Sequence, residues 1–236
     1  MAIGKVYLIP TVLQEDDQAF EVLPSYILDR IKLCDIFFAE NIKTTRRYFK
    51  RWWKEMVIDQ YDWYAIHKME EATIETFKKS LQEGKNVGII SEAGCPGVAD
   101  PGQRLIDAAQ GLGAIVHPLV GPSSILLALM ASGMNGQKFK FCGYLPIDKT
   151  ERRKMIGSLE EESKVQQCTQ IFIETPYRNN ALIADIIGVC HPDTRLCIAV
   201  DITSKQEIIQ TRPLHFWKTH MPDFHKRPAI FLLLSS

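Results

Sequence analysis

The sequence has no excess of charge of either sign, because 28 Lys and Arg residues balance 28 Asp and Glu residues in its 236 positions. Without a global positive field, any contact with nucleic acid must be local. Long hydrophobic runs are also missing. The two longest, Ile125–Ala131 and Ala229–Leu234, fall far short of the roughly 20 residues that a transmembrane helix needs. We therefore expect no membrane partner.

Targeting and cross-linking signals are also absent. The N-terminus lacks the basic segment, apolar stretch and cleavage site of a secretory signal. The six cysteines form no C-x-x-C pair and mostly lie in apolar runs, as reduced core cysteines do. His215, His220 and His225 follow each other at intervals that would turn successive rings by about 140° on a helix, away from a common metal. These absences predict a cytoplasmic protein without a metal site.

Short apolar runs alternate with longer amphipathic stretches, which is typical of an α/β protein with a largely parallel sheet. In the first half the pattern predicts strands at Lys5–Ile9, Ile36–Ala39, Val57–Asp59, Asn86–Ile90 and Ala114–His117, and helices at Glu21–Leu33, Thr44–Lys54, Met69–Gln82 and Gln103–Gly111.

A break near Pro118–Pro122 precedes a second series of elements. It contains predicted helices at Ser123–Ser132, Glu151–Lys164 and Asn179–Val189, and predicted strands at Phe139–Gly143, Gln170–Ile173, Leu196–Val200, Glu207–Gln210 and Ala229–Leu234. Closely spaced turns favour a more antiparallel sheet near the C-terminus. We expect two α/β domains, residues 1–118 with a largely parallel sheet and residues 119–236 with a mixed one.

The most informative segment is S-E-A-G-C-P-G-V-A-D-P-G at residues 91–102, between a predicted strand and a predicted helix. The carboxyl end of a parallel strand is where α/β proteins bind ligands. Glycine has no Cβ and proline fixes φ, so this backbone can approach a ligand closely. The alternative is a long rigid turn, although such connections usually need only about 2–6 residues.

Two further segments place polar groups beside predicted elements. V-G-P-S-S at residues 120–124 leads into an apolar helix whose free N–H groups could receive a carboxylate or phosphate. I-F-I-E-T-P-Y-R at residues 171–178 ends a strand. The alternative for the first is a helix cap that binds nothing, as most serine caps do, and for the second a capped turn before the next helix. The phosphate-binding patterns G-x-G-x-x-G and G-x-x-x-x-G-K-[ST] and the hydrolase pattern G-x-S-x-G are missing, which disfavours Rossmann dehydrogenases, P-loop NTPases and the commonest hydrolases.

Residues 43–54 carry six positive charges and no negative one. As a helix, the segment would present Lys43, Arg47, Lys50 and Lys54 on one face and Thr45, Phe49, Trp52 and Met56 on another. A basic face beside exposed aromatic rings would suit RNA, through phosphate contacts and base stacking. The alternative is a solvated face over a core stripe or a dimer seam. A second basic cluster, Lys149–Lys154, could act as a mobile lid.

Taken together, these motifs resemble a known family. The segment at 91–102 is similar to the S-[DE]-A-G-x-P-x-x-x-D-P-G signature of the tetrapyrrole methylase superfamily, especially its ribosomal RNA small subunit methyltransferase I branch. Supporting matches are V-Y-L-I-P-T at 6–11, A-E at 39–40, P-L-V-G-P-S-S at 118–124, F-C-G-Y-L-P at 141–146 and I-E-T at 173–175.

The resemblance implies a two-domain α/β methyltransferase, usually a homodimer, that holds S-adenosylmethionine in the cleft between an N-terminal acceptor side and a C-terminal donor side. Donor contacts, largely through main-chain groups, are implied at Ile9, Pro10, Glu92, Gly94, Cys95, Ser123, Ser124, Glu174, Thr175 and Ala229.

The chain departs from the branch pattern at three places. Residues 10–15 read P-T-V-L-Q-E where the branch has P-T-P-I-G-N, and residues 40–43 read E-N-I-K where it has E-D-T-R. Only His67 remains of an H-[DE]-H-N motif. Glu40 and Lys43 are the catalytic candidates, with an ordinary ion-paired strand end as the alternative. Arg47, Lys50 and Asp100 are the candidate substrate-binding residues.

Methyl transfer from a sulfonium is an in-line displacement that depends mainly on orientation, and a hydroxyl acceptor also needs a base for its proton. The resemblance favours methylation of a ribose 2′-hydroxyl in small-subunit ribosomal RNA. Two alternatives stay open, namely carbon methylation of a tetrapyrrole or other small molecule, and a donor-binding protein with diminished catalysis.

Overall fold

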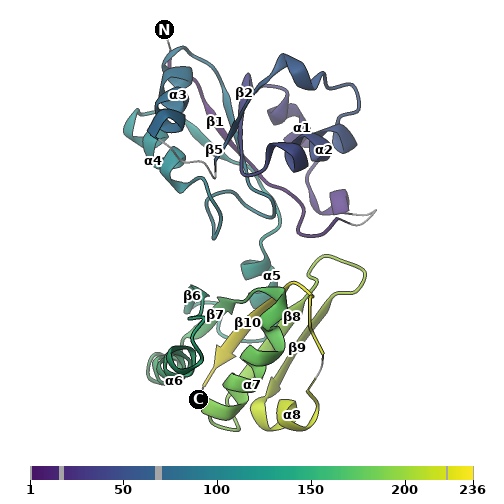
Figure 1. Ribbon diagram of the computed structural model, residues 1–236, viewed down its shortest axis with the longest axis vertical. Helices are drawn as coiled ribbons and strands as arrows, with labels where there is room; N and C mark the ends of the chain where they lie inside the picture. Colours follow the sequence, from purple (N-terminus) through teal and green to yellow (C-terminus); the bar gives the residue numbers. More distant parts are fainter. Residues whose placement is uncertain (1, 16–18, 67–70, 222, 236) are drawn as a thin grey trace. The chain divides into compact units, whose positions relative to one another are not determined.

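The computed structural model describes residues 2–15, 19–66, 71–221 and 223–235. The chain divides into two compact units, Met1–Ser123 and Ser124–Ser236 (Figure 1). The predicted boundary, after residue 118, lies a few residues earlier, within the segment that leads up to this division. Within the described residues, no helix is both long enough and apolar enough to cross a bilayer.

Unit 1 is built on a five-stranded sheet in the order β3-β2-β4-β1-β5, in which every neighbouring pair is parallel. Its strands are β1 (Val6–Ile9), β2 (Ile36–Ala39), β3 (Asp62–Ala65), β4 (Val87–Ile90) and β5 (Val116–Pro118). Its helices are α1 (Tyr26–Ile31), α2 (Ile42–Trp52), α3 (Glu71–Gln82) and α4 (Gln103–Gly111). The predicted α/β class and parallel sheet are confirmed.

Both faces of this sheet are covered, which explains why its strands read as continuous apolar runs. Phe38 packs with Phe77 and Leu105 in one core cluster, on the side of α3 and α4. Its neighbour Phe37 points to the opposite face and packs with Phe49, on the side of α1 and α2 (Figure 1). This alternation follows from the two-residue period of a strand. Because all strands are parallel, their carboxyl ends meet at one edge of the sheet.

Unit 2 has a mixed sheet in the order β6-β7-β10-β8-β9, where β6 and β7 are parallel and the other pairs are antiparallel. Its strands are β6 (Phe139–Tyr144), β7 (Thr169–Ile173), β8 (Arg195–Val200), β9 (Ile208–Pro213) and β10 (Ala229–Leu234). Its helices are α5 (Ser124–Ser132), α6 (Lys149–Gln166), α7 (Asn179–Val189) and α8 (Leu214–Thr219). The mixed sheet agrees with the prediction.

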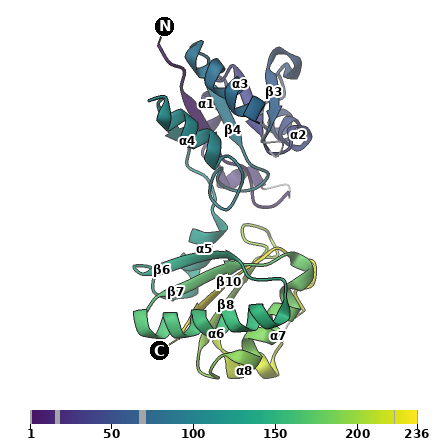
Figure 2. The same ribbon diagram turned by 60° about the vertical axis from the view of Figure 1, so that its left-hand side comes forward.

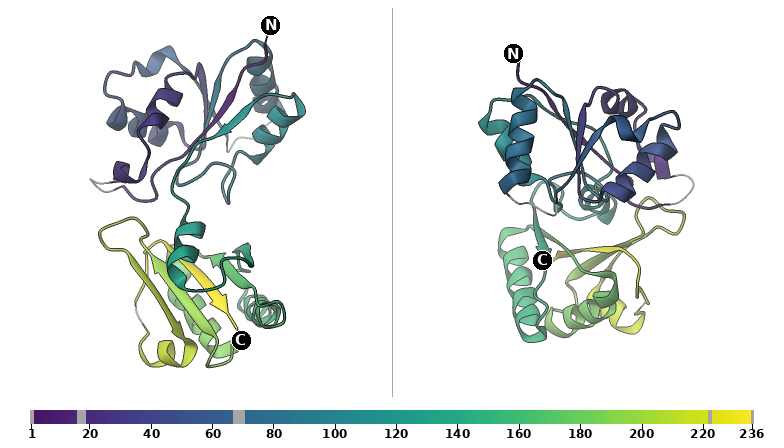
Figure 3. Two further views of the ribbon diagram at one scale, coloured as in Figure 1. Left: turned by 180° about the vertical axis from the view of Figure 1, so that it is seen from behind. Right: turned by 45° about the horizontal axis from the view of Figure 1, so that its top comes forward.

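The helices of unit 2 cover its sheet from both sides. Figure 2 shows α6, α7 and α8 on one face, where Ile156, Ile183 and Trp217 join the core of Phe172 and Phe231. Helix α5 lies against β9 and β10 on the other face, as the view from behind in Figure 3 also shows.

Three elements differ from the sequence-based expectation. The predicted helix at Glu21–Leu33 is split into a 3-10 turn at Ala19–Val22 and the short helix α1, because Pro24 lacks an N–H group for a continuous helix. The predicted strand at Val57–Asp59 is wrong. A 3-10 turn occupies Ile58–Gln60, and the real edge strand β3 follows it with a mostly half-buried pattern that gives no apolar run. Helix α8 was not predicted.

Candidate functional site

The segment at residues 91–102 forms a loop between β4 and α4, as predicted. Its backbone has a positive φ at Gly94 (70°), Gly97 (80°), Ala99 (61°) and Gly102 (121°). Three of these positions are glycine, for which such angles carry little cost. Ala99 is the exception, and it directly precedes Asp100. A left-handed conformation at a residue with a Cβ is the kind of strain that accumulates at functional sites.

The loop is tied to the chain on both sides of it. The Gly94 carbonyl accepts a hydrogen bond from the Thr11 N–H (2.9 Å), just beyond β1. The Cys95 thiol lies 3.5 Å from the Pro122 carbonyl oxygen. Pro10 in turn packs on Gly121, where an added Cβ would lie 2.1 Å from the proline Cβ. Pro10, Gly94 and Cys95, three of the predicted donor-binding residues, are thus brought together in unit 1.

A small hollow of about 90 Å³ lies at the same edge of the sheet. It is lined by residues that follow β1 (Thr11, Val12, Leu13, Gln14 and Glu15), by the first turns of α2 (Thr44, Thr45 and Tyr48) and by the start of the 91–102 loop (Ser91, Glu92 and Ala93). Residues 12–15 of this lining are the ones that differ from the P-T-P-I-G-N motif of the ribosomal RNA methyltransferase branch. The departure therefore changes a wall of the hollow and, at Val12, also the core cluster that contains Tyr7 and Ile9 of β1.

Three carboxylates gather at the carboxyl ends of β2 and β4. The Glu92 N–H donates to Glu40 Oε2 (2.8 Å), and the Thr44 hydroxyl donates to Glu92 Oε1 (3.3 Å). Burial, together with the negative charges of Glu40 and Glu92, raises the pKa of Asp100 to about 6. Asp100, a predicted substrate-binding residue, therefore lies where its proton affinity is raised, as is common at functional sites. The positive φ of Ala99 and the nearness of Glu40 and Glu92 are visible only in the structure.

The altered E-N-I-K motif keeps a structural task of its own. Asn41 is the N-cap of α2, and its side-chain oxygen accepts hydrogen bonds from the N–H groups of Lys43 (3.1 Å) and Thr44 (3.3 Å). Asparagine and aspartate cap helices about equally well, so this replacement leaves the start of α2 intact. The side chain of Lys43, a predicted catalytic residue, is on an exposed position of the first turn.

The structure of the basic helix α2 decides what its apolar face does. Thr45, Phe49 and Met56 are buried and pack into the core of unit 1, so the apolar stripe is a core stripe. Arg47 is exposed and pairs with Glu15 (3.5 Å). The Lys50 ammonium donates to the carbonyl oxygens of Lys54 (2.6 Å) and Met56 (2.9 Å).

All four residues of the predicted basic face are exposed to solvent. Lys43, Arg47, Lys50 and Lys54 are all exposed, as the alternative of a solvated face requires. Phe49 is too buried to stack on a base, whereas Trp52, on the same predicted face, is half-buried against the core.

In unit 2, Glu174 directly follows strand β7, and its side chain is fully buried. Its Oε1 accepts hydrogen bonds from the Thr175 N–H (2.6 Å) and from the Arg178 guanidinium. Its Oε2 has no hydrogen-bond partner within the described part of the chain, and the same holds for Asn179 Oδ1. An unpaired buried acceptor costs about 1–3 kcal/mol, so these atoms suit a ligand that donates hydrogen bonds.

The loop before β10, which contains Phe224 and Arg227, is hydrogen-bonded to Asn179. Asn179 Nδ2 donates to the carbonyl oxygens of Phe224 (3.1 Å) and Arg227 (2.7 Å). Ala229 then opens β10 opposite Val200. Glu174 and Thr175 thus follow the end of β7, and Ala229 opens the neighbouring strand β10.

The predicted donor residues therefore fall into two groups. Unit 1 holds Ile9, Pro10, Glu92, Gly94, Cys95 and Ser123, and unit 2 holds Ser124, Glu174, Thr175 and Ala229. The boundary between the two units falls between Ser123 and Ser124. His67, the remnant of the H-[DE]-H-N motif, lies outside the described residues.

Comparison with known proteins decides the family. The family model described as Tetrapyrrole (Corrin/Porphyrin) Methylases matches residues 21–215, which is most of the chain. The protein belongs to this family. The predicted resemblance and the prediction of a methyltransferase are therefore confirmed.

Several curated relatives are named ribosomal RNA small subunit methyltransferase I. The protein from Bacillus subtilis is 30% identical over 209 residues, covering 87% of this chain and 66% of the relative. That from Escherichia coli O157:H7 is 27% identical and covers 89% and 70%, and that from Pseudomonas aeruginosa is 35% identical and covers 60% and 50%. The chain thus spans between half and about 70% of the length of these three methylase relatives.

Solved structures show the same fold at low identity. The methyltransferase CobJ has a TM-score of 0.64 at 15% identity, covering 99% of this chain and 95% of that one. A uroporphyrin-III C-methyltransferase from Thermus thermophilus, solved with S-adenosyl homocysteine, has a TM-score of 0.54 at 14% identity and 98% coverage of both chains. These tetrapyrrole methylase neighbours confirm the fold class.

Proposed function

We propose that this methylase transfers the methyl group of S-adenosylmethionine to a ribose 2′-hydroxyl of small-subunit ribosomal RNA. The observation that carries the acceptor chemistry is the carboxylate group of Glu40, Glu92 and Asp100, in which Asp100 has a pKa close to neutrality. The names of the relatives support the choice of ribosomal RNA.

The residues of unit 2 fit the donor. S-adenosylmethionine carries ribose hydroxyls and amino groups that donate hydrogen bonds, and the unpaired acceptors Glu174 Oε2 and Asn179 Oδ1 are suited to receive them. The Thr175 main chain, ordered by its bond to Glu174, lies beside them. When bound, this cofactor supplies an electrophilic methyl group on a positively charged sulfur.

Asp100 serves as the general base in the proposed reaction. Ionised above pH 6, it removes the proton of the attacking hydroxyl while the oxygen bonds to the methyl carbon and the carbon–sulfur electron pair leaves with the sulfur. Glu40 and Glu92 act by raising the proton affinity of Asp100 through their charge. Glu40 is thus assigned to tuning the base, and Lys43 to contact with the RNA backbone.

The exposed basic face of α2 supports an RNA acceptor. Lys43 and Arg47 lie on the helix whose first turn lines the hollow, and lysine and arginine contact phosphates without reading sequence. Because the protein has no net charge, we expect few phosphate contacts and a modest dependence of binding on salt.

We also propose that the protein is a homodimer. Helix α5 is apolar on all sides, and although Ile125 and Leu129 pack inward, Met130 and Leu126 are 78% and 52% exposed. Large exposed apolar side chains on one helix favour burial against a partner. Sedimentation at several concentrations tests this, with a Met130→Glu, Leu126→Glu variant expected to be monomeric; a wild-type monomer at all concentrations would contradict it.

The assay for the activity measures transfer from labelled S-adenosylmethionine to small ribosomal subunits lacking this modification, with a porphyrinogen as the competing acceptor. We expect labelling of the subunits alone, on a ribose. Labelling of the porphyrinogen alone, or of neither acceptor despite donor binding, would refute the proposed acceptor.

The role of Asp100 is tested by Asp100→Asn, which we expect to lower the transfer rate by about 10²–10⁴. Asp107→Asn, an exposed change on the adjacent α4, serves as the control. In the wild type the rate should rise with pH through about 6. Glu92→Gln removes a neighbouring negative charge and should move this rise to lower pH. A rise that is unchanged in Asp100→Asn would assign the base elsewhere.

A further inference from the structure

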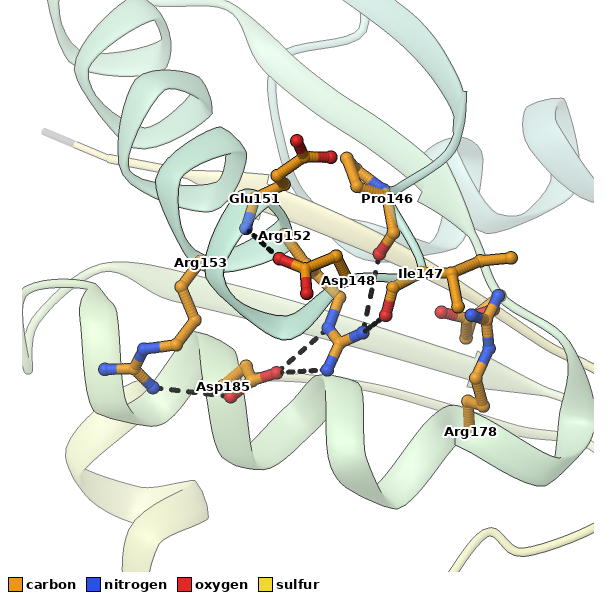
Figure 4. A network of polar contacts seen from close by, with 9 residues as sticks. Pro146, Ile147, Asp148, Glu151, Arg152, Arg153, Arg178 and Asp185 are labelled. Carbon is orange, nitrogen blue, oxygen red and sulfur yellow. Dashed lines mark hydrogen bonds and ion pairs between the residues drawn. The ribbon is translucent and has the colours of Figure 1, made fainter.

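The loop between β6 and α6, residues 145–148, is held by one buried arginine. Arg152, in the first turn of α6, donates from Nε (2.9 Å) and Nη2 (2.7 Å) to Asp185 Oδ2 on α7. Its Nη1 donates to the carbonyl oxygens of Ile147 (2.8 Å) and Pro146 (3.4 Å) (Figure 4). A single guanidinium therefore joins two helices to two consecutive carbonyl groups of the loop.

Neighbouring contacts complete this anchor. Asp185 Oδ1 receives Arg153 Nη1 (3.3 Å), and Asp148 caps α6 by accepting from the Glu151 N–H (2.9 Å). The side chains of Arg152 and Asp185 are 8% and 5% exposed. With Arg152 buried and Asp148 serving as a helix cap, this basic cluster is an anchored helix start and not the mobile lid considered from the sequence.

A buried ion pair is weak evidence for stability, because the cost of removing both charges from water offsets much of their attraction. What such a pair does supply is a fixed geometry. Arginine is suited to this task, because its planar fork holds a carboxylate and still has donors left for the loop carbonyls. The loop conformation, more than the stability of the unit, is what the Arg152–Asp185 pair secures.

The anchored loop lies beside the donor residues of unit 2. Strands β6 and β7 are parallel, and Tyr144 at the end of β6 is paired with Ile173, the residue before Glu174. Glu174 is itself held by an ion pair with Arg178. Tyr144 and Ile147 are 61% and 78% exposed, although Leu145 between them is buried. The loop thus presents apolar side chains at the edge where Glu174 keeps its unpaired oxygen.

We propose that residues 145–148 form a wall of the donor site, with Ile147 as an apolar contact for the bound nucleoside, and that Arg152 is the positioning residue that sets this wall. The proposal rests on the proposed function, because it takes S-adenosylmethionine as the ligand at Glu174. It adds a segment and a residue that act on donor affinity without belonging to the acceptor side.

The test separates positioning from stability with a double variant. Arg152→Met with Asp185→Leu replaces the ion pair by apolar side chains, an exchange that often leaves stability unchanged. Arg153 then loses its carboxylate partner, but it keeps its hydrogen bond to the Gly188 carbonyl oxygen (3.0 Å) and is exposed enough to reach water. The matched control is Lys140→Met with Glu162→Leu, which removes the ion pair (2.7 Å) near the other end of the same helix. Calorimetry gives the dissociation constant of S-adenosylmethionine, and urea unfolding gives stability.

We expect the Arg152/Asp185 double variant to bind S-adenosylmethionine at least tenfold more weakly at an unchanged urea midpoint, and the control to bind as the wild type does. Hydrogen exchange at the Ile147 and Asp148 amides should be faster in the double variant alone. Ile147→Ser, which leaves the anchor intact, should also weaken donor binding.

Unchanged donor affinity in both the double variant and Ile147→Ser would overturn the inference, as would an effect confined to the KM for the RNA acceptor. If the double variant unfolds, Ile147→Ser and the exchange rates in Arg152→Lys still decide it. Failure of the wild type to bind S-adenosylmethionine at all would instead refute the proposed function.

Discussion

Asp100 should make the native protein less stable at the pH at which it works. Its pKa is raised from 3.8 to about 6 by burial and by Glu40 and Glu92. In the unfolded chain the carboxyl returns to its ordinary pKa. Between these values the native state holds a proton that the unfolded state has released, so native stability falls as the pH rises from about 4 to 6. Replacing Asp100 by asparagine removes this penalty.

The size of the effect follows from the displacement of the pKa. One pKa unit corresponds to about 1.4 kcal/mol, so a change from 3.8 to about 6 sets an upper limit of about 3 kcal/mol. Asp100 is only half-buried, and the solvent screens part of this interaction. We therefore expect Asp100→Asn to gain about 1–2 kcal/mol in free energy of unfolding at pH 7.5, together with its loss of activity.

Urea unfolding of the wild type and of Asp100→Asn at pH 4.5, 6 and 7.5 measures this gain. It should shrink steadily towards pH 4.5, because there the native carboxyl is protonated and carries no partly buried charge. Asp107→Asn should show no such pH dependence. A gain of equal size at pH 4.5 and 7.5, or no gain at pH 7.5, would refute the reasoning that Asp100 holds its proton near neutrality.

Three further changes test the packing on which the site depends. Phe37→Ala removes a fully buried ring that contacts three other aromatic rings, and should cost about 3–5 kcal/mol in urea unfolding; a loss below 1 kcal/mol would show that the core refills the space. Gly121→Ala drives a Cβ into Pro10 and should cost about 1–3 kcal/mol, whereas Gly136→Ala, in open space, should cost far less. Asp148→Ala removes the cap of α6 and should cost about 1 kcal/mol, restored by Asp148→Ser; a lower melting temperature in both variants would contradict a capping role.

Gly94 is a poor position at which to test donor binding. A valine at Gly94 would enter the predicted donor site, but Gly94 has φ at 70°, and its added Cβ would meet Leu13 (3.3 Å) and the Pro122 carbonyl oxygen (3.4 Å). Such a variant strains the backbone and disturbs packing as well as the donor. Changes at Glu174 and Ile147 test donor binding with less disturbance of the main chain.

The sequence by itself determined the α/β class, the parallel sheet of unit 1 and the loop at 91–102, because apolar periodicity and glycine placement are local properties of the chain. It also indicated the family through that loop. It could not recognise the edge strand β3 or the six-residue helix α8, since an edge strand need not be apolar and a short helix derives its stability from tertiary packing.

Only the tertiary structure decided what the polar residues do. Asp100 and Glu40 are far apart in the chain, and their mutual effect on protonation arises because two parallel strands end at the same edge of the sheet. In the sequence, Arg152 belongs to a cluster of basic residues. Only the packing of α7 against α6 shows that it forms an ion pair with Asp185. The burial of Phe49 likewise depends on α2 packing against the sheet. Proton affinity, ion pairing and burial depend on distances between segments remote in sequence, which no local pattern contains.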